Sequence, residues 1–364
     1  MTESNPSRQK SVVEGVDRHI TAVSGGVTVP SSRYRVDAVL TEMHARGWQT
    51  KSLHGYGHLD RKITNRLLRK AYRTACRANR ARVTASLNVD HPVLVQRLAI
   101  PTWSGPELKL ASKSHGIVFD FDDAVFLDPK QQECRRRRHA LNNVFRASRH
   151  VVAGNAWLAD HVPSGCDVSV IPTCLNTDEY LPKPSNKSFE SSSVRIGWIG
   201  TTSNFRHLEQ LIAPMEKLRR QFPKVEFAVC SDVKDTRLLS QLGATFVPWS
   251  ARTELATLQS FDIGIMPLTD EDWCRGKCSF KLIQYLAVGI PSVSSPVGMN
   301  SDVVEDGVSG LFAHDGDWFS PLANLVECGE SRRKIGEIAR QVAVARFSIQ
   351  RAADSYIQLL RALQ

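Results

Sequence analysis

The sequence predicts an α/β protein of two domains, each with a parallel sheet that helices cover on both faces. Three observations support this prediction. The chain has 364 residues, more than one hydrophobic core usually organises. Strand-like apolar runs alternate with amphipathic helical runs along most of its length. A strand, a glycine, a polar loop and a helix follow one another at residues 20–47, and the same order returns from residue 194.

Composition indicates an ordinary globular chain with excess positive charge. Hydrophobic residues make up 42% and charged residues 23%, and no apolar run approaches the roughly 20 residues that span a bilayer. Residues 1–17 are polar, so we expect a disordered tail, no signal peptide and a cytoplasmic protein. The net charge of +10 indicates an anionic partner: a nucleotide, a lipid surface or nucleic acid. The eight cysteines lack zinc-site spacing, and we expect reduced thiols.

The first strand–loop–helix unit carries glycines and arginines at its loop. Gly25 and Gly26 follow the strand, and Arg33 and Arg35 stand where the next helix begins. The glycine spacing does not match the dinucleotide-binding fingerprint. We therefore expect the arginines to point into the cleft above the sheet edge, although ordinary surface arginines would fit the same pattern.

A later strand of the first half ends in acidic residues. Asp120 and Asp122 follow the apolar run 116–119, and ligands of open α/β sheets bind at the carboxyl ends of strands. The carboxylates could bind sugar hydroxyls, cap the next helix or hold a metal ion. No phosphate-binding motif accompanies them, so we rank the metal last.

Two basic segments in the first half indicate contact with an anionic surface. Residues 61–82 form a basic amphipathic helix, and residues 135–138 are four consecutive arginines. Such a helix can lie on an anionic membrane, although most are solvated faces. Neither segment is interleaved with aromatic residues, as a surface that stacks nucleic-acid bases would be.

The strongest functional signal lies in residues 275–291, where a basic loop leads into a short amphipathic helix that ends at Gly289. Unpaired N–H groups and the helix dipole attract anions at such a junction. Lys277 and Lys281 are four residues apart and Arg275 stands at the loop edge, so three cations can converge on one phosphate. A solvated basic helix start would explain the cations alone equally well.

Together these features resemble the glycosyltransferases with the GT-B fold, and the second half resembles glycosyltransferase family 4. The resemblance covers residues 20–360, and its most specific part lies within 273–298, which begins WCRGKCSFKLIQY. The other segments that carry it are 31–35, 120–123, 196–200, 261–268 and 348–349. It implies two Rossmann-like domains with parallel sheets facing across a cleft, and a retaining, metal-independent hexosyltransferase.

The chain departs from the family at one pair of positions. The family commonly has two glutamates eight positions apart here, one for the donor sugar and one for the ribose. Gly276 and Gln284 occupy those positions in this chain. Gln284 can still hydrogen-bond a ribose, but Gly276 offers no carboxylate, and Glu271 and Asp272 are the candidates to replace it.

The resemblance also implies a set of site residues. Fixed cations would stabilise the leaving nucleoside diphosphate, a catalytic role for Arg206, Lys277 and Lys281. The expected donor-binding residues are Gly200, Thr201, Glu271, Asp272, Arg275, Cys278, Ser279, Phe280 and Gln284. The expected acceptor-side residues are Gly25, Gly26, Arg33, Asp120 and Asp122. No metal or other cofactor is expected beyond the co-substrate, a UDP-, GDP- or ADP-sugar.

The expected organisation is an acceptor domain at 18–176, a linker at 177–193 and a donor domain at 194–347, with a C-terminal helix at 348–364 that completes the first domain.

The expected partners are the donor, a glycan or lipid-linked acceptor of a polysaccharide or cell-envelope pathway, and peripherally the inner face of an anionic membrane. The main alternative is a non-catalytic protein of this fold that binds a nucleotide-sugar or polyanion. The net charge keeps a nucleic-acid-binding module open, although we expect no nucleic acid, and a GT-B epimerase fits the main motif poorly.

Overall fold

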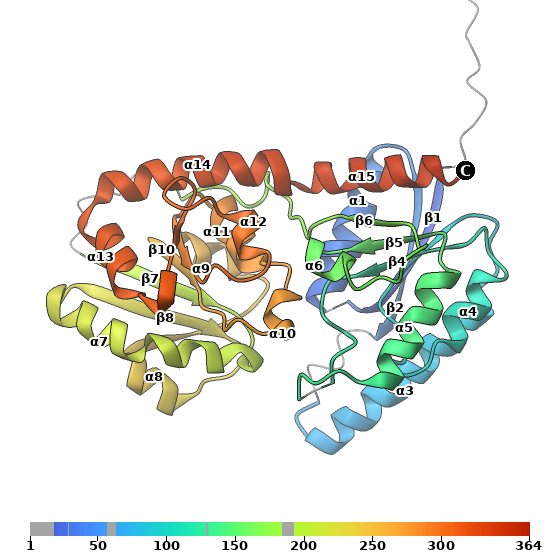
Figure 1. Cartoon of the computed structure of the whole chain (residues 1–364), viewed down its shortest axis with the longest axis horizontal. Helices are drawn as coiled ribbons and strands as arrows, with labels where there is room; N and C mark the ends of the chain where they lie inside the picture. The colour runs from blue at the N-terminus through green and yellow to red at the C-terminus, as the bar shows by residue number, and fades with distance from the viewer. Residues whose placement is uncertain (1–17, 28, 57–62, 129, 184–192) are drawn as a thin grey trace, which may run out of the picture.

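A computed structural model describes residues 18–27, 29–56, 63–128, 130–183 and 193–364. The expected tail at 1–17 and much of the expected linker lie outside these residues. Within them the chain forms two parallel six-stranded sheets, ordered β2-β1-β3-β4-β5-β6 and β12-β11-β10-β7-β8-β9. The predicted fold class, two α/β units with parallel sheets, is confirmed. Figure 1 shows the units side by side, with helices α14 and α15 running across both.

The first sheet is apolar at its centre because its inner strands are covered on both faces. Every residue of β3 and β4 is buried. The strands are β1 (His19–Gly26), β2 (Gln49–Tyr56), β3 (Val93–Gln96), β4 (Ile117–Phe121), β5 (His150–Ala153) and β6 (Val168–Val170). The helices are η1 (Ser32–Asp37), α1 (Ala38–Ala45), α3 (Arg66–Ser86), α4 (Gly105–Ala111), α5 (Arg135–Ala147) and α6 (Ala156–Ala159).

The second sheet repeats the plan and carries more short helices at its cleft edge. Its strands are β7 (Val194–Ile199), β8 (Val225–Ser231), β9 (Ala244–Pro248), β10 (Ile263–Met266), β11 (Ser292–Ser294) and β12 (Leu311–Phe312). The helices before the C-terminal pair are η2 (Thr202–Leu211), α7 (Ile212–Gln221), α8 (Thr236–Leu242), α9 (Glu254–Gln259), α10 (Asp272–Arg275), α11 (Phe280–Ala287), α12 (Asn300–Val303), η3 (His314–Gly316) and α13 (Phe319–Glu327). Among the helices described, none has the length and apolar character needed to cross a membrane.

The last two helices connect the domains. Helix α14 (Gly329–Phe347) packs on α11, and α15 (Ile349–Ala362) packs on α1 of the first domain. Ser348 breaks the helical path between them with an extended backbone. Leu175 pairs there with both helices, since its N–H bonds the Phe347 carbonyl and its carbonyl accepts from the Ile349 N–H. The chain therefore returns to its first domain at its end (Figure 1).

A buried ion pair joins three elements of the first domain. Asp120 near the end of β4 accepts hydrogen bonds from Arg35 at 2.5, 2.9 and 3.2 Å, and one from the Tyr356 hydroxyl of α15 at 2.9 Å. Arg35 also donates to the Ile171 carbonyl and to Thr173. Asp120 is fully buried and Arg35 nearly so. The structure therefore corrects the expectation that Asp120 binds acceptor and that Arg35 points into the cleft: each neutralises the other inside the domain.

Replacing Asp120 should destabilise the fold. Asp120→Asn leaves the buried Arg35 guanidinium without its counter-charge, a change that removes roughly 3 kcal/mol or more of unfolding free energy. Urea denaturation followed by circular dichroism measures it. The matched control is Asp354→Asn, because Asp354 also pairs with an arginine but its side chain is 58% exposed; it should lose less than about 1 kcal/mol. Equal losses in the two variants would contradict this assignment.

Candidate functional site

Three cations gather at the edge of the second sheet. Arg206 lies on η2, Lys277 lies in the loop after α10, and Lys281 lies in the first turn of α11. The Lys277 Nζ donates to Asn204 Oδ1 at 2.9 Å. A Cβ at Gly200 would lie 2.6 Å from Lys281 Cε, so only glycine at position 200 leaves room for the lysine as it is placed.

The pKa values nearby show that these cations share one small region. His207 is buried, and its pKa is lowered to about 4 by burial and then by the charges of Arg206 and Lys277. The pKa of Lys281 is lowered to about 7, first by burial and then by Lys277. Cations held together in a desolvated place are destabilised until an anion joins them, and perturbed titrations of this kind mark candidate binding sites.

The start of helix α11 presents backbone N–H groups to the same region. Ser279 precedes the helix with φ of 47°, and its hydroxyl donates to Asn300 Oδ1 at 2.7 Å without capping the helix. The Cys278 thiol donates to the Asp122 carbonyl at 3.2 Å. The side chains of Ser279 and Cys278 are thus turned into the protein, which leaves their backbone, and not their side chains, for a ligand. An uncapped helix start favours an anion.

Phe280 and Gln284 face the first domain at a cluster of buried hydroxyls. The Phe280 ring packs on Tyr34, with centroids 4.2 Å apart. Glu254 accepts hydrogen bonds from Tyr34 at 2.7 Å and from Tyr180 at 2.6 Å, and Gln284 lies near the Tyr180 hydroxyl. Gln284 is only 3% exposed, so a ribose would have to exchange with Tyr180. No local sequence pattern indicates this cluster, because Tyr34 and Glu254 are 220 positions apart.

Glu271, and not Asp272, lies with the cations. The Glu271 carboxylate forms an ion pair with Arg206 and accepts from the Cys274 thiol at 3.4 Å. Asp272 is exposed and lies 3.6 Å from Arg275, whose guanidinium also binds Asp270 at 2.7 Å. The structure therefore does not bring the side chains of Arg275 and Asp272 to the cation group.

Thr201 lies in the loop between β7 and η2 and is exposed. Its hydroxyl is 2.9 Å from that of Ser203 and accepts from Asn204 at 3.1 Å. Asn204 in turn binds Lys277, so Thr201 lies in the outer wall of the cation group.

One group of side chains has the composition of a metal site. His207, Glu271 and Cys274 each offer one ligand atom, all within 4.8 Å of one another. Burial raises the pKa of Cys274 to about 11, and Glu271 already pairs with Arg206. The charges around the group therefore favour an anion over a metal cation.

Gly276 lies where the two domains touch. A Cβ at this position would lie 2.8 Å from the Cβ of Ala124 and 3.0 Å from its backbone nitrogen. No side chain fits there without a shift of the loops. The carboxylate that the family pattern leads one to expect at position 276 is therefore excluded by the approach of the first domain.

The acceptor-side residues are distributed over two hollows. Gly25 lines a cavity of about 310 Å³ in the first domain. Arg33 lies over the Tyr34 ring at 4.9 Å and lines a separate hollow with Glu254. The Gly26 N–H donates to Ser32 Oγ. Asp122 accepts from Arg97 at 2.6 Å, so it supports the cavity wall.

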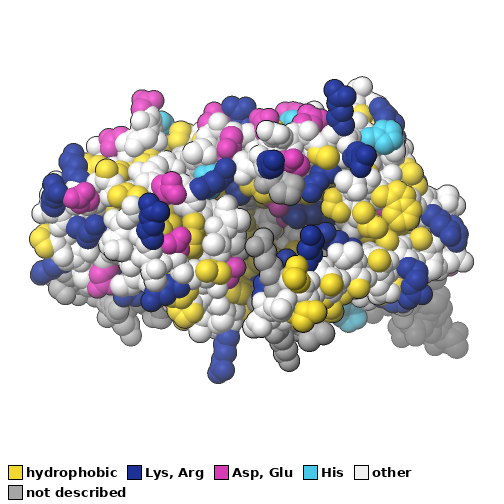
Figure 2. Space-filling model, turned by 90° about the horizontal axis from the view of Figure 1, so that it is seen from below, with side chains coloured by type: hydrophobic (Ala, Val, Ile, Leu, Met, Phe, Trp, Pro, Cys, Tyr) yellow, Lys and Arg dark blue, Asp and Glu magenta, His cyan; other side chains and the backbone are white. Residues whose placement is uncertain are grey.

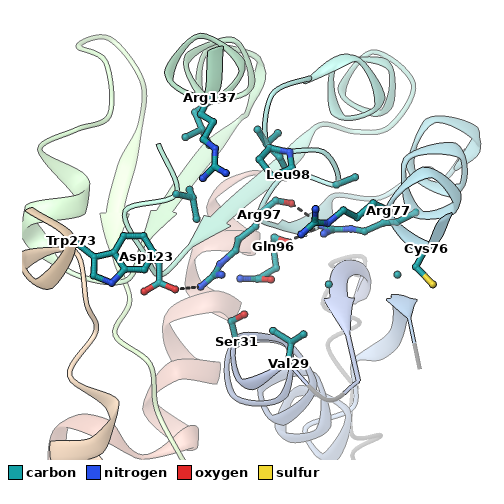
Figure 3. Close-up of a pocket in the computed structure, with 17 residues that line it drawn as sticks. Val29, Ser31, Cys76, Arg77, Gln96, Arg97, Leu98, Asp123, Arg137 and Trp273 are labelled. Atoms are coloured by element: carbon teal, nitrogen blue, oxygen red, sulfur yellow. Dashed lines mark hydrogen bonds and ion pairs between the residues drawn. The ribbon is translucent and has the colours of Figure 1, made fainter. Parts of the chain in front are cut away.

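Arginines and Asp123 form much of this cavity, and the sequence did not predict that these residues share a cavity. Arg77, Arg80, Arg97 and Arg137 line it beside Asp123, and Trp273 reaches it from the second domain (Figure 3). Figure 2 shows a hollow between the domains in which Lys and Arg side chains gather. Arg77, Arg80 and Arg137 belong to the basic segments 61–82 and 135–138. Those segments predict contact with an anionic surface, and not a cavity.

Comparisons with known proteins agree with this architecture. Residues 193–328 match a family model described as Glycosyl transferases group 1. Spore coat protein SA of Bacillus subtilis (strain 168) is 28% identical over 78 residues, which are 20% of this chain. The match covers 21% of that protein, so it spans about a fifth of the curated relative.

Solved structures share the fold over nearly the whole chain. A glycosyltransferase from Rickettsia africae ESF-5 has a TM-score of 0.68 at 14% identity, over 95% of this chain and 98% of that one. Sucrose-phosphate synthase from Thermosynechococcus elongatus has a TM-score of 0.72 at 14% identity, over 95% and 99%. HepE from Anabaena, in complex with UDP-glucose, has a TM-score of 0.66 at 14% identity, over 94% and 99%.

The fold is thus that of the two-domain GT-B class. Residues 193–328 of the second half match the glycosyl transferases group 1 model, and the predicted resemblance of the chain to GT-B glycosyltransferases is confirmed.

A side chain at Gly276 should disturb transfer more than nucleotide binding. Gly276→Ala and Gly276→Glu push the loop away from Ala124, and misplacing reacting groups by about 1 Å lowers a rate roughly 100-fold. We expect nucleotide affinity, which the cations of the second domain would govern, to change less than about threefold. Transfer assays and calorimetric titration measure the two effects.

The control for this prediction is a compensating change. Gly276→Ala combined with Ala124→Gly removes the methyl group that lies nearest, and it should recover part of the lost rate. Higher transfer in Gly276→Glu than in the unchanged protein would contradict the steric account, since it would mean that a carboxylate was the missing element.

Proposed function

We propose that this chain is a glycosyltransferase that moves a sugar from a nucleotide-sugar donor to a glycan or lipid-linked acceptor, with retention of configuration and without a metal ion. The observation that carries the proposal is the group of cations, Arg206, Lys277 and Lys281, at the uncapped start of α11. A diphosphate is the ligand that matches this arrangement in charge, and the motif in residues 273–298 is where the family resemblance is most specific.

The neighbouring structures support a nucleotide-sugar donor. HepE has been solved with UDP and with UDP-glucose, so UDP is the first nucleotide to test here. A Staphylococcus aureus TarM mutant was solved with fondaparinux, α-GlcNAc-glycerol and UDP, which favours glycan-like acceptors, although this chain covers only 55% of that chain. Polysaccharide or cell-envelope synthesis is the corresponding process.

In the proposed reaction an acceptor hydroxyl oxygen bonds to the anomeric carbon of the donor sugar. The bond from that carbon to the diphosphate breaks, and the electron pair leaves with the diphosphate, which also takes the hydroxyl proton. Negative charge therefore grows on the leaving group. Arg206, Lys277 and Lys281 stabilise it from fixed positions, and this is how preorganised cations lower a barrier.

The first domain would bind the acceptor and help to exclude water from the site. Gly154 allows close contact, because a Cβ there would lie 2.3 Å from Cys278 Sγ. Contact at this point brings the loop after β5 against the start of α11. Closing a site in this way limits hydrolysis of the donor.

Calorimetric titration with UDP, GDP and ADP, with and without EDTA, tests the donor site. One nucleotide should bind with an affinity that EDTA does not change, and Lys281→Ala should weaken it roughly 10- to 100-fold, as expected for a lost charge-assisted hydrogen bond. Lys334→Ala is the control, because Lys334 pairs with Glu330 on an exposed face of α14; it should change affinity less than twofold.

The same titration should depend on pH through Lys281. Its pKa of about 7 in the unliganded protein means that the lysine is mostly neutral above pH 7, whereas a diphosphate favours the charged form. Binding above pH 7 therefore takes up a proton, and affinity falls as pH rises, by at most about tenfold per pH unit. Lys281→Ala should remove this slope.

Three results would count against the proposal in different ways. Binding without product from any nucleotide-sugar would favour the non-catalytic nucleotide-sugar binder. Absence of nucleotide binding would remove the donor site altogether. Loss of affinity in EDTA, or a product of inverted anomeric configuration by NMR, would overturn only the metal-independent or retaining part.

Peripheral contact with an anionic membrane is a further part of the proposal. Leu67 and Leu68 at the start of α3 are 77% and 63% exposed, and Arg69 and Lys70 follow them. Exposed apolar side chains beside basic ones suit the interface of an anionic bilayer. Flotation with phosphatidylglycerol vesicles should show binding that Leu67→Ser/Leu68→Ser lowers by at least about fivefold.

The control for the vesicle experiment is Val308→Ser/Val344→Ser, which changes two other exposed apolar side chains. It should leave vesicle binding unchanged. Equal loss in both double variants, or no binding by the unchanged protein, would contradict membrane contact through α3.

A further inference from the structure

The cavity of about 310 Å³ in the first domain has a composition that the proposed function does not explain. It lies at the carboxyl ends of β1 and β3, with walls from α3 and α5, and α10 of the second domain contributes Trp273. Its volume is at the lower end of the range for ligand pockets, so it suits about one sugar unit. The side chains that line it are unusually basic.

From this cavity we propose, on the basis of the proposed function, that the acceptor is anionic: it carries a phosphate or carboxylate that binds between Arg77 of α3 and Arg137 of α5, beside the sugar unit that receives the transferred residue.

Two of the four arginines belong to the wall of the cavity. Arg97 binds both Asp122, at 2.6 Å, and Asp123, at 2.5 Å. Its backbone is left-handed, with φ of 60°, a strained conformation for a residue other than glycine. Arg80 is buried and donates to the carbonyls of Gln96 and Arg97. These arginines fix the end of β3 and are committed to the protein.

Arg77 and Arg137 are the two arginines left for a ligand. Arg137 donates one hydrogen bond to the Leu127 carbonyl at 2.5 Å, and within the described residues no ion pair involves Arg77 or Arg137. Asp123 is the one carboxylate among the residues that line the cavity, and Arg97 neutralises it. Both side chains line the same cavity, and an anion bound between them could accept charge-assisted hydrogen bonds from both guanidinium groups.

The opposite side of the cavity connects to the donor site. Figure 3 shows Trp273 and Asp123 together on one side, with Arg97 reaching toward Asp123 and Arg137 extending from α5 into the space. The Lys277 Nζ lies 5.5 Å from the centre of the Trp273 ring. An acceptor ring against Trp273 would thus lie next to the cation group, and Asp123 could accept a hydrogen bond from its hydroxyl. The anionic group would then reach the two arginines.

The test uses the full-length protein saturated with UDP and three probes: glucose, glucose 6-phosphate and glucuronic acid. Binding is measured by calorimetry and by saturation-transfer NMR. At least one anionic probe should bind about tenfold more tightly than glucose, as two charge-assisted contacts predict. The comparison of glucose 6-phosphate with glucuronic acid distinguishes a phosphate from a carboxylate.

Arg77→Gln/Arg137→Gln should remove the preference for the anionic probe, and its affinity for UDP should be unchanged. Arg136→Gln is the matched control, since Arg136 is exposed on the same helix and does not line the cavity; it should keep the preference. Arg80 and Arg97 are left intact because they hold the wall.

Equal binding of glucose and both anionic probes, or binding of none, would overturn the proposal. Equal loss in the double variant and in Arg136→Gln would overturn it too, since it would indicate general surface charge. UDP binding is recorded in every sample, so failure of the donor site is distinguished from failure of the acceptor assignment. Trp273→Ala should weaken neutral and anionic probes by the same factor; an effect on the anionic probe alone would contradict the placement of the ring.

Discussion

The close approach of two backbones organises the site. Gly276 meets Ala124, and Gly154 meets Cys278, at distances that leave no room for a further carbon atom. These contacts place the cation group of the second domain beside the cavity of the first. A side chain at either glycine would separate two half-sites, each of which lacks what the other supplies. The two half-sites can therefore meet only because position 276 carries no side chain.

The charge distribution of the site depends on where the two domains place their side chains. The second domain holds three cations near one point, and the lowered pKa values of His207 and Lys281 record how strongly burial and mutual repulsion act on them. Glu271 offsets part of the charge through Arg206. The fold keeps this arrangement because Arg206 comes from η2, Lys277 from the loop between α10 and α11, and Lys281 from the first turn of α11. A ligand that brings negative charge therefore gains from repulsion that already exists in the unliganded protein.

Sequence reasoning succeeded where the signal was local. The proximity of Lys277 and Lys281 could be predicted because their loop and helix are continuous in the chain, and the alternation of strands and helices predicted the fold class. It failed where partners are distant. Asp120 follows an apolar strand like a ligand-binding residue, but Tyr356, which binds it, lies 236 positions away. Arg77 and Arg137 looked like surface charge, because only the packing of α3 and α5 around one cavity gives them a common target.

The two halves of the site share a bias toward anions, and this bears on how the chain differs from the family pattern. A carboxylate at position 276 would lie beside Ala124, one residue from Asp123, and would add negative charge close to a residue of the cavity that Arg77 and Arg137 line. An anionic acceptor would be repelled by such a group just where it must enter. Glycine at position 276 therefore has two effects. It allows the domains to touch, and it adds no negative charge between the cation group and the cavity.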